Sequence, residues 1–337
     1  MKKLVLRLSF LISFLFAVTL AFAQAVTYPS KFTVAKDGSG DFKTIQEAVD
    51  AVRDLSQQQV IIFIKNGIYN EKLVIPSWKK RISLIGQSKD STVITYDDYS
   101  GKANPGGKDA FGKDKFTTYT SYTVLVQGDD CRIENLSIKN TAGRVGQAVA
   151  LHVEGDRFVA INCVLTGNQD TLYTATNGSR QYYQGCYIEG TTDFIFGEAT
   201  AVFQNCTIKS LTNSFITAAS TTASQKFGYV FFDCKLVADP SATKVFLGRP
   251  WRPNAKTVFI NTEMGSHITP VAWDNWRNPE NEKTVIYAEY NSRGEGAKQA
   301  ERAKWSKQLS PKEVKRYTLK NIFNSETEWI PQAKFSS

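Results

Sequence analysis

The sequence contains few histidines and lacks the motifs of the common hydrolytic and zinc centres. Its 337 residues include only two histidines, His152 and His267, and no G-x-S-x-G segment. A Ser-His-Asp esterase of the α/β-hydrolase type needs that elbow, so this class is disfavoured. There is also no C-x-x-C pair, and we therefore predict no structural zinc site. Nothing else in the sequence requires a metal or an organic cofactor, and we expect neither.

Long hydrophobic runs are missing except at the N-terminus. There, three basic residues lead into an apolar run at 8–22, which ends in the small-x-small pattern Ala-Phe-Ala at 21–23. This pattern is typical of a cleaved secretory signal peptide, and the run is short for a membrane-spanning helix. We predict that residues 1–23 are removed and that residues 24–337 are exported, to the periplasm or the medium. No proline- and serine-rich linker divides the remainder, so we expect a single domain without a membrane span.

The chain also lacks a run of lysines and arginines. Its formal net charge is +9, and three of the basic residues lie within 1–23, which leaves +6. With export predicted and no basic run, nucleic acid is not expected as a partner. A basic exported protein suits an acidic polysaccharide. Charge alone, however, is explained more simply by a mildly basic surface with no assigned partner.

Cysteines are scarce and odd in number, so at least one thiol is expected to be free in an oxidising compartment. The five are Cys131, Cys163, Cys186, Cys206 and Cys234. Four of them occupy similar places in the segments "FVAINCVLTG", "YYQGCYIEG", "AVFQNCTIKS" and "YVFFDCKLVA", at spacings of 23, 20 and 28 residues. A period of 20-odd residues made of short strands and turns indicates a β-solenoid.

The predicted fold is therefore all-β and wound, with short helices outside the coil. The strands are too short and too closely spaced for helical crossovers, which argues against a doubly wound α/β sheet, while a β-sandwich is the all-β alternative. One helix is predicted at 43–55, with Ile45, Ala48, Val49 and Val52 on one face and Asp41 as its cap. It would cover the open end of the coil. A second helix is predicted near 297–308.

Three polar residues are spaced by the length of one coil. Gln147, Asp170 and Asp193 are separated by 23 and 23 residues, so they would stack in one column on adjacent strands about 4.8 Å apart. Spacing alone is equally compatible with a column of surface polar residues. Two carboxylates this close do not readily both ionise, which favours an acid working beside a nucleophile. Glutamine N–H groups suit a developing oxyanion.

Four short blocks then carry a resemblance to a known family. "GQAVAL", "QDTLY", "GTTDFIFG" and "LGRPW" (247–251), in this order, resemble the signature blocks of the pectin methylesterases, or pectinesterases, which form carbohydrate esterase family 8. The similarity extends to "DGSGDFKTIQEAVDAV" and "YAEYNSRGEGA" and covers nearly all of the predicted mature chain. It implies a right-handed parallel β-helix and the removal of methyl esters from the galacturonate units of pectin. The expected products are methanol and pectate, and the expected state is a monomer.

The resemblance also implies a role for each site residue. Asp193 corresponds to the nucleophile, Asp170 to the general acid and base, and Gln147 and Gln169 to the residues that stabilise the tetrahedral intermediate. Arg249 would keep Asp193 ionised by a bidentate contact that lowers its pKa. Each has a structural alternative: the carboxylates could cap turns, the glutamines could form an amide ladder, and Arg249 could form a surface ion pair.

The resemblance implies further contacts with substrate and one disulfide. Trp251 would stack on a sugar ring, although a tryptophan between prolines could equally pack a loop. Thr118, in the segment "FTTYTS", aligns with a substrate contact of the family. Phe194 and Phe196 point to opposite faces, and the sequence does not say which one lines a cleft. Cys186 and Cys206 match a family disulfide, with two buried thiols as the alternative.

Three other functions are alternatives to this interpretation. A polygalacturonase can use the same scaffold and paired carboxylates, but the glutamines and "LGRPW" argue against it. A pectate lyase would need acidic calcium-binding clusters, which are not apparent. A binding module without catalysis would not need all five site residues.

Overall fold

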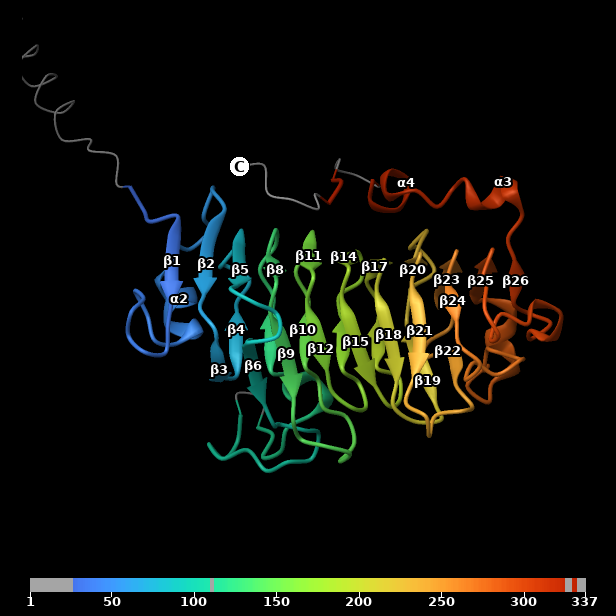
Figure 1. Cartoon of the computed structure of the whole chain (residues 1–337), viewed down its shortest axis with the longest axis horizontal. Helices are drawn as coiled ribbons and strands as arrows, with labels where there is room; N and C mark the ends of the chain where they lie inside the picture. Colours follow the sequence, from blue (N-terminus) through green and yellow to red (C-terminus); the bar gives the residue numbers. More distant parts are fainter. Residues whose placement is uncertain (1–26, 110–111, 325–328, 332–337) are drawn as a thin grey trace, which may run out of the picture.

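The computed structural model describes residues 27–109, 112–324 and 329–331. The predicted signal peptide at 1–23 lies outside these ranges. The described chain winds into three parallel sheets that run side by side along one axis (Figure 1). None of the described helices is long and apolar enough to cross a membrane.

The first sheet has eleven strands and follows the order β1-β2-β5-β8-β11-β14-β17-β20-β23-β25-β26. Its strands are β1 (Lys31–Val34), β2 (Val60–Ile64), β5 (Ile82–Gly86), β8 (Arg132–Glu134), β11 (Phe158–Ile161), β14 (Arg180–Gln184), β17 (Thr200–Gln204), β20 (Tyr229–Phe232), β23 (Lys256–Ile260), β25 (Ile286–Tyr290) and β26 (Lys307–Gln308).

The second sheet has eight strands in the order β24-β21-β18-β15-β12-β9-β6-β3. These are β3 (Gly67–Asn70), β6 (Thr92–Tyr96), β9 (Ser137–Asn140), β12 (Val164–Thr166), β15 (Tyr187–Gly190), β18 (Thr207–Ser210), β21 (Lys235–Ala238) and β24 (Glu263–Met264).

The third sheet has seven strands in the order β22-β19-β16-β13-β10-β7-β4 and carries the site described below. These are β4 (Leu73–Ile75), β7 (Val124–Val126), β10 (Leu151–Val153), β13 (Leu172–Thr174), β16 (Ile195–Gly197), β19 (Phe215–Ala219) and β22 (Phe246–Pro250). Each strand pairs in parallel with strands one coil away. The fold is thus the right-handed parallel β-helix that the sequence predicted.

The core lies inside the coil because alternate residues of each strand point inward. In β2 the burial alternates along "VIIFI", with Val60, Ile62 and Ile64 buried. One inward column consists of stacked aromatic rings. Tyr183, Phe203, Phe231 and Phe259 follow one another with centroids 4.8, 4.5 and 4.3 Å apart. Such like-on-like stacking is what a regular coil produces, since successive coils place equivalent residues directly above each other.

Of the two predicted helices, only the one at the N-terminal end of the coil is found in the structure. Helix α2 (Ile45–Ala51) lies at the N-terminal end, where Ile45, Ala48 and Val49 join the core, as predicted. Its cap is Thr44, in a capping box with Glu47, and not Asp41, whose carboxylate accepts the N–H of Thr33.

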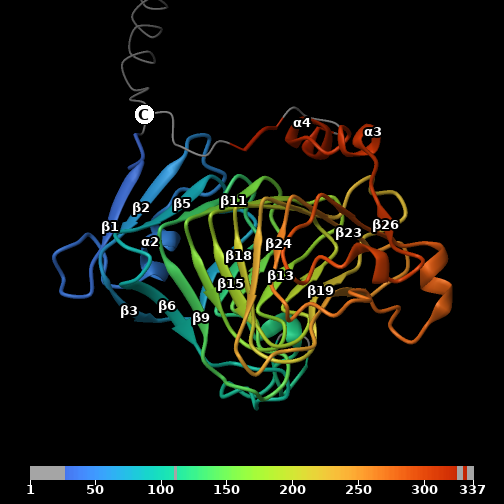
Figure 2. The same ribbon diagram turned by 45° about the vertical axis from the view of Figure 1, so that its right-hand side comes forward.

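The prediction of a helix near 297–308 is wrong. That segment holds a short 3₁₀ turn, η3 (Gln299–Glu301), and then β26, which pairs with β25. The C-terminal helices are α3 (Pro311–Val314) and α4 (Leu319–Phe323), which lie over the outer face of the eleven-stranded sheet (Figures 1 and 2). A 3₁₀ turn, η2 (Pro279–Lys283), precedes β25.

The predicted disulfide between Cys186 and Cys206 is absent, because all five cysteines are free, buried thiols. Cys186 lies between two other thiols, Cys163 and Cys206, and interacts with both. Each of these sulfurs also lies near a backbone carbonyl of its own coil or the previous one, as in the 3.6 Å contact from Cys186 Sγ to Ala160 O. The repeat that aligned the cysteines in the sequence therefore stacks them as a column of thiols.

Candidate active site

A cleft on the outer face of the seven-stranded sheet gathers most of the predicted site residues. Its cavity of about 210 Å³ is lined by Thr118, Tyr119, Gln147, Gln169, Asp170, Asp193, Phe196, Ala218, Arg249, Trp251 and Trp276. Its floor is formed by residues of β16, β19 and β22, and by the residues that directly precede β13 and β16. The sequence missed Tyr119, Ala218 and Trp276. Ala218 is in register between Phe196 and Arg249, but a small apolar residue gives no site signal. Tyr119 and Trp276 lie outside the strands and follow no coil spacing.

The two carboxylates lie at equivalent places on adjacent coils, as their 23-residue spacing predicted. The pairing of Leu172 with Ile195 puts Asp170 and Asp193 in register, each two residues before its strand. Both have left-handed backbones, with φ of 66° and 49°. This conformation is uncommon for residues other than glycine and is often found at functional sites. Here it is part of the tight turn that leads into each strand.

Asp193 and Arg249 form a bidentate ion pair. Arg249 Nε donates to Asp193 Oδ1 at 2.9 Å, and Arg249 Nη2 donates to Oδ2 at 2.6 Å. Burial raises the pKa of Asp193 above its ordinary value, Arg249 lowers it, and Asp274 raises it. Sequence reasoning expected Arg249 to lower this pKa overall, and the structure shows that desolvation outweighs the guanidinium.

Asp170 is the carboxyl group that stays protonated near neutral pH. It is 7% exposed, and its pKa is raised to about 8, first by burial and then by the charge of Asp193. Arg249 opposes this shift only through its charge, whereas it donates hydrogen bonds directly to Asp193. The environment therefore favours a protonated Asp170 beside an ionised Asp193, the division of roles that acid–nucleophile chemistry requires.

The glutamines line the same cavity, but their register differs from the prediction. Gln147 pairs with Gln169 across a parallel bridge, and not with Asp170. The N–H of Ala148 donates to Gln169 O at 3.1 Å, which fixes this pairing. This coil is shorter than the one between Asp170 and Asp193, which spans 23 residues. The bridged glutamines are 22 residues apart, and the strands that follow them pair at a spacing of 21, Leu151 with Leu172. Both glutamines still line the same cavity as the two aspartates.

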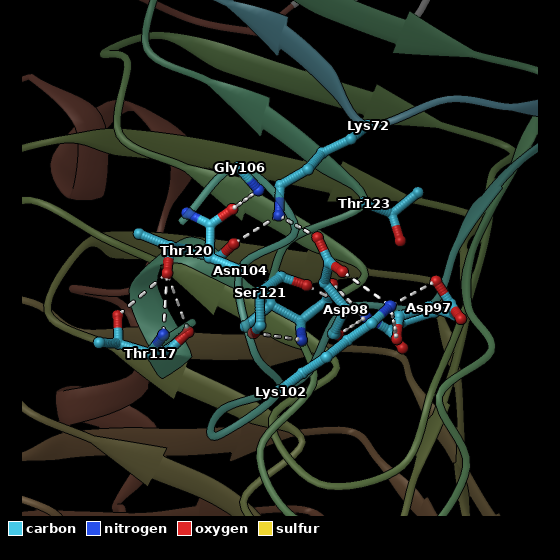
Figure 3. A network of polar contacts seen from close by, with 12 residues as sticks. Lys72, Asp97, Asp98, Lys102, Asn104, Gly106, Thr117, Thr120, Ser121 and Thr123 are labelled. Atoms are coloured by element: carbon cyan, nitrogen blue, oxygen red, sulfur yellow. Dashed lines mark hydrogen bonds and ion pairs between the residues drawn. The ribbon is translucent and has the colours of Figure 1, made fainter. Parts of the chain in front are cut away.

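Thr118 enters the cleft on the 3₁₀ turn η1 (Thr118–Thr120), which a buried polar network holds in place (Figure 3). Lys72 Nζ donates to Thr120 O at 2.6 Å and pairs with Asp98, whose side chain is 3% exposed. Ser121 Oγ donates to Thr118 O at 2.9 Å. The N–H of Ser100 in the same loop donates to Gln147 O at 2.8 Å. The network thus ties η1 and the Gln147 backbone to one support.

Aromatic side chains form the walls of the cleft. Tyr173 stacks on Phe196 with centroids 4.5 Å apart, and Trp251 meets Phe196 edge-on at 5.9 Å. Phe196 lines the cavity, whereas Phe194 is fully buried in the core. The prediction that Phe194 contacts substrate is therefore wrong. Phe194 precedes β16 and lies in the turn after the left-handed Asp193, so the alternation of the strand does not extend to it. Within β16 itself, Ile195 points into the core and Phe196 points outward to the cleft.

Neither histidine belongs to the cleft. His152 is buried in β10, 4.4 Å from the ring of Tyr173, and His267 lies in a separate groove near β24. Among the described residues, no group of three or more His, Cys, Asp or Glu side chains is placed to hold a metal ion.

The family model and the curated relatives that match this sequence are all pectinesterases. A family model described as Pectinesterase matches residues 31–326. The chain is 39% identical over 317 residues to "Pectinesterase 4" of Arabidopsis thaliana, covering 90% of this chain and 51% of that protein. It is 36% identical to "Pectinesterase 31" of the same plant, covering 88% and 94%. The chain spans about half the length of several curated relatives that it matches.

Solved structures agree with these sequence matches. A pectin methylesterase from carrot superposes with a TM-score of 0.79 at 32% identity, covering 89% of this chain and 94% of that one. A pectin methylesterase solved in complex with a hexasaccharide superposes with a TM-score of 0.74 at 29% identity, covering 91% and 100%.

Proposed function

Because the chain belongs to the pectinesterase family, we propose that it hydrolyses the methyl esters of galacturonate units in pectin and releases methanol. The observation that carries the proposal is the contrast between the two carboxyl groups. Asp193 is held by a guanidinium at 2.6 and 2.9 Å, while the pKa of Asp170 is raised to about 8. One group is thus an anion available for attack, and its neighbour is an acid.

In the first half of the reaction, an Asp193 carboxylate oxygen attacks the ester carbonyl carbon. The resulting oxyanion is stabilised by the side-chain N–H groups of Gln147 and Gln169. The bond to the methoxy oxygen then breaks, Asp170 gives its proton to that oxygen, and methanol leaves. The product is an anhydride between Asp193 and the galacturonate carbonyl.

In the second half, Asp170 is ionised and acts as the base. It takes one proton from a water molecule, whose oxygen attacks the same carbonyl carbon and displaces the Asp193 carboxylate. The galacturonic acid that is formed leaves and loses its remaining proton to solvent. This restores the Asp193 carboxylate and the proton on Asp170. Arg249 holds Asp193 in the orientation for attack throughout, and Thr118, Phe196 and Trp251 would contact the sugar chain.

The same proposal includes a substrate, a cellular location and an oligomeric state. The substrate is a methyl-esterified homogalacturonan outside the cytoplasm, reached after removal of residues 1–23, and the enzyme acts as a monomer. The net positive charge suits a product that becomes more acidic with each ester removed. A polygalacturonase is not favoured, because the cleft pairs the carboxylates with two glutamines and an arginine and the matched relatives are esterases.

Assays on highly methylated pectin test the proposal. We expect methanol release without any shortening of the chain. New reducing ends would instead indicate a hydrolase, and absorbance from unsaturated uronides would indicate a lyase. Asp193→Ala should abolish methanol release while the circular dichroism spectrum stays that of the wild type. Asp90→Ala, at an exposed carboxylate, is the matched control and should leave activity unchanged.

A further inference from the structure

The guanidinium of Arg249 lies between two aromatic rings. Its Cζ is 4.0 Å from the ring centroid of Phe215 and 3.8 Å from that of Trp276. Phe215 is the first residue of β19, and Trp276 lies in the loop before η2, so the two rings come from different coils. The rings occupy the faces of the guanidinium, which leaves its edge for the carboxylate of Asp193.

Phe215 contacts both members of the ion pair. Its carbonyl accepts the N–H of Asp193 at 2.9 Å, and its ring packs against Arg249. A second ring, Phe246, lies behind Phe215 with centroids 5.1 Å apart, in the neighbouring strand β22. Phe215 does not line the cleft, unlike Trp276. A change at Phe215 therefore acts on the Asp193–Arg249 pair without removing a contact to substrate.

A guanidinium is planar and stacks on aromatic faces, so rings against its faces restrict its rotation and help to keep a bidentate contact in one plane. Aromatic faces attract the cation and also exclude water from it, which strengthens its field at the carboxylate. Without the rings, Arg249 could rotate out of the plane of Asp193 and pair with water. Its ability to favour the ionised carboxylate would then decrease, while burial of Asp193 would continue to oppose ionisation.

We propose that Phe215 and Trp276 are positioning residues that clamp Arg249 between their rings and so keep Asp193 in its attacking, ionised form. The inference rests on the proposed esterase function and extends it to residues to which the resemblance assigned no role. The other ionisable groups that act on Asp193 or are influenced by it are Asp170, Asp274 and the Tyr287 hydroxyl. None of them changes in the variants used below.

The first experiment compares Phe215→Leu with Phe215→Tyr, since the leucine keeps an apolar side chain and the tyrosine keeps the ring. Methanol release is measured on methylated pectin across pH 4–9. We expect Phe215→Leu to lower kcat by about 3–30-fold, the range for one such cation–ring contact, with KM within twofold. The acid limb of the pH profile should move to higher pH, and Phe215→Tyr should restore the wild-type profile. Phe246→Leu, one ring further from Arg249, is the control and should leave the acid limb in place.

An acid limb that is unchanged in Phe215→Leu would overturn the proposal, as would a loss of activity that is equal in Phe215→Tyr. A poorly folded variant reduces the amount of active enzyme but does not shift the pH at which the acid limb falls. A shift of the acid limb therefore distinguishes a loss of the clamp from a loss of packing.

A second measurement does not depend on activity. The rate at which phenylglyoxal modifies Arg249, followed by peptide mass spectrometry, should rise several-fold in Phe215→Leu and Trp276→Leu relative to Phe215→Tyr and Trp276→Phe. Equal rates would refute the clamp. If the wild type released no methanol but this difference held, the proposed function would fail and the clamp would stand.

Discussion

At the scale of the residue, two equal side chains are given opposite tasks by what surrounds them. Asp170 and Asp193 occupy matching positions on adjacent coils, with similar burial and the same left-handed backbone. They differ in that only Asp193 receives hydrogen bonds from Arg249. The different protonation of the two aspartates therefore depends on which of them the guanidinium of Arg249 contacts.

The raised pKa of Asp170 gives a prediction about both activity and stability. Because methanol departure needs the protonated acid, kcat/KM should fall as the pH rises through about 8. A carboxyl whose pKa rises on folding, from an ordinary 3.8, keeps a proton that the unfolded chain releases. Its contribution to stability is therefore lost progressively between about pH 4 and pH 8.

Asp170→Asn removes this titration. We expect the variant to be inactive, equal to the wild type in unfolding free energy at pH 4, and more stable at pH 9 by at least about 1 kcal/mol. Urea unfolding at the two pH values measures the difference, with Asp90→Asn as the control. A variant that loses stability at pH 9 would contradict the burial argument.

Gln147 gives a second prediction at this scale. Removing one donor to an oxyanion typically lowers kcat by about 10²–10³, so Gln147→Ala should show such a loss with little change in KM. Gln57→Ala, at an exposed glutamine, provides the comparison. If only KM changed, Gln147 would position the sugar and not the intermediate.

At the scale of the element, the turns between the first and second sheets repeat as strictly as the strands. One turn position has φ between 50° and 59° on successive coils, and its residues are Asn135, Asn162, Gly185, Asn205, Asp233, Asn261 and Asn291. Their side chains form a ladder in two stretches. Asn162 Nδ2 donates to Asn135 Oδ1 at 2.9 Å in the first, and Asn261 and Asn291 donate to Asp233 and Asn261 in the second. Gly185 is the one member without a side chain, and the first stretch ends before it.

Gly185→Asn should extend the first stretch of the ladder and stabilise the protein. A Cβ there meets no atom within 4 Å, and asparagine tolerates this φ better than most residues. The added hydrogen bonds and the restricted unfolded chain should raise Tm by about 1–3 °C. Gly178 also has a positive φ, 86° against 59° at Gly185, and open space around it, but it has no ladder neighbours. Gly178→Asn should therefore give no gain. Equal shifts in both variants would show that the ladder contributes nothing.

At the scale of the whole molecule, stability comes from a continuous core and not from covalent links. The main cluster of buried apolar residues runs from Phe32 to Ala303 inside the coil and includes the five cysteines, while two smaller clusters lie outside it. A core of this length can stabilise a fold without disulfides.

This arrangement predicts the response of the intact protein to thiol reagents. Under denaturing, non-reducing conditions all five cysteines should react with a thiol probe, and in the native state almost none should, because all are buried. A reducing agent should leave Tm unchanged. Fewer than five reactive thiols would mean that a bridge forms after all, with Cys186 and Cys206 as the first pair to examine by peptide mapping.

The sequence by itself determined the features that repeat. The spacing of cysteines and β-prone runs was enough to predict a solenoid, and the equal spacing of Asp170 and Asp193 placed the two carboxylates on adjacent coils. Local signals also identified α2, because apolar positions recur at helical spacing there. The four blocks pointed to Gln147, Gln169 and Arg249, and the structure brings all of them into one cleft.

Tertiary structure decided what depends on the lengths of individual coils and on contacts between distant segments. Gln147 pairs with Gln169 because that coil is shorter than the next, and Trp276 reaches Arg249 from a loop with no repeat of its own. The faces of Phe194 and Phe196, the free thiol of Cys186 and the strand in place of a helix at 307–308 were settled in the same way. The physical reason is that a period in the sequence fixes which residues lie near each other, whereas register, side-chain direction and pKa follow from the packing of several coils at once.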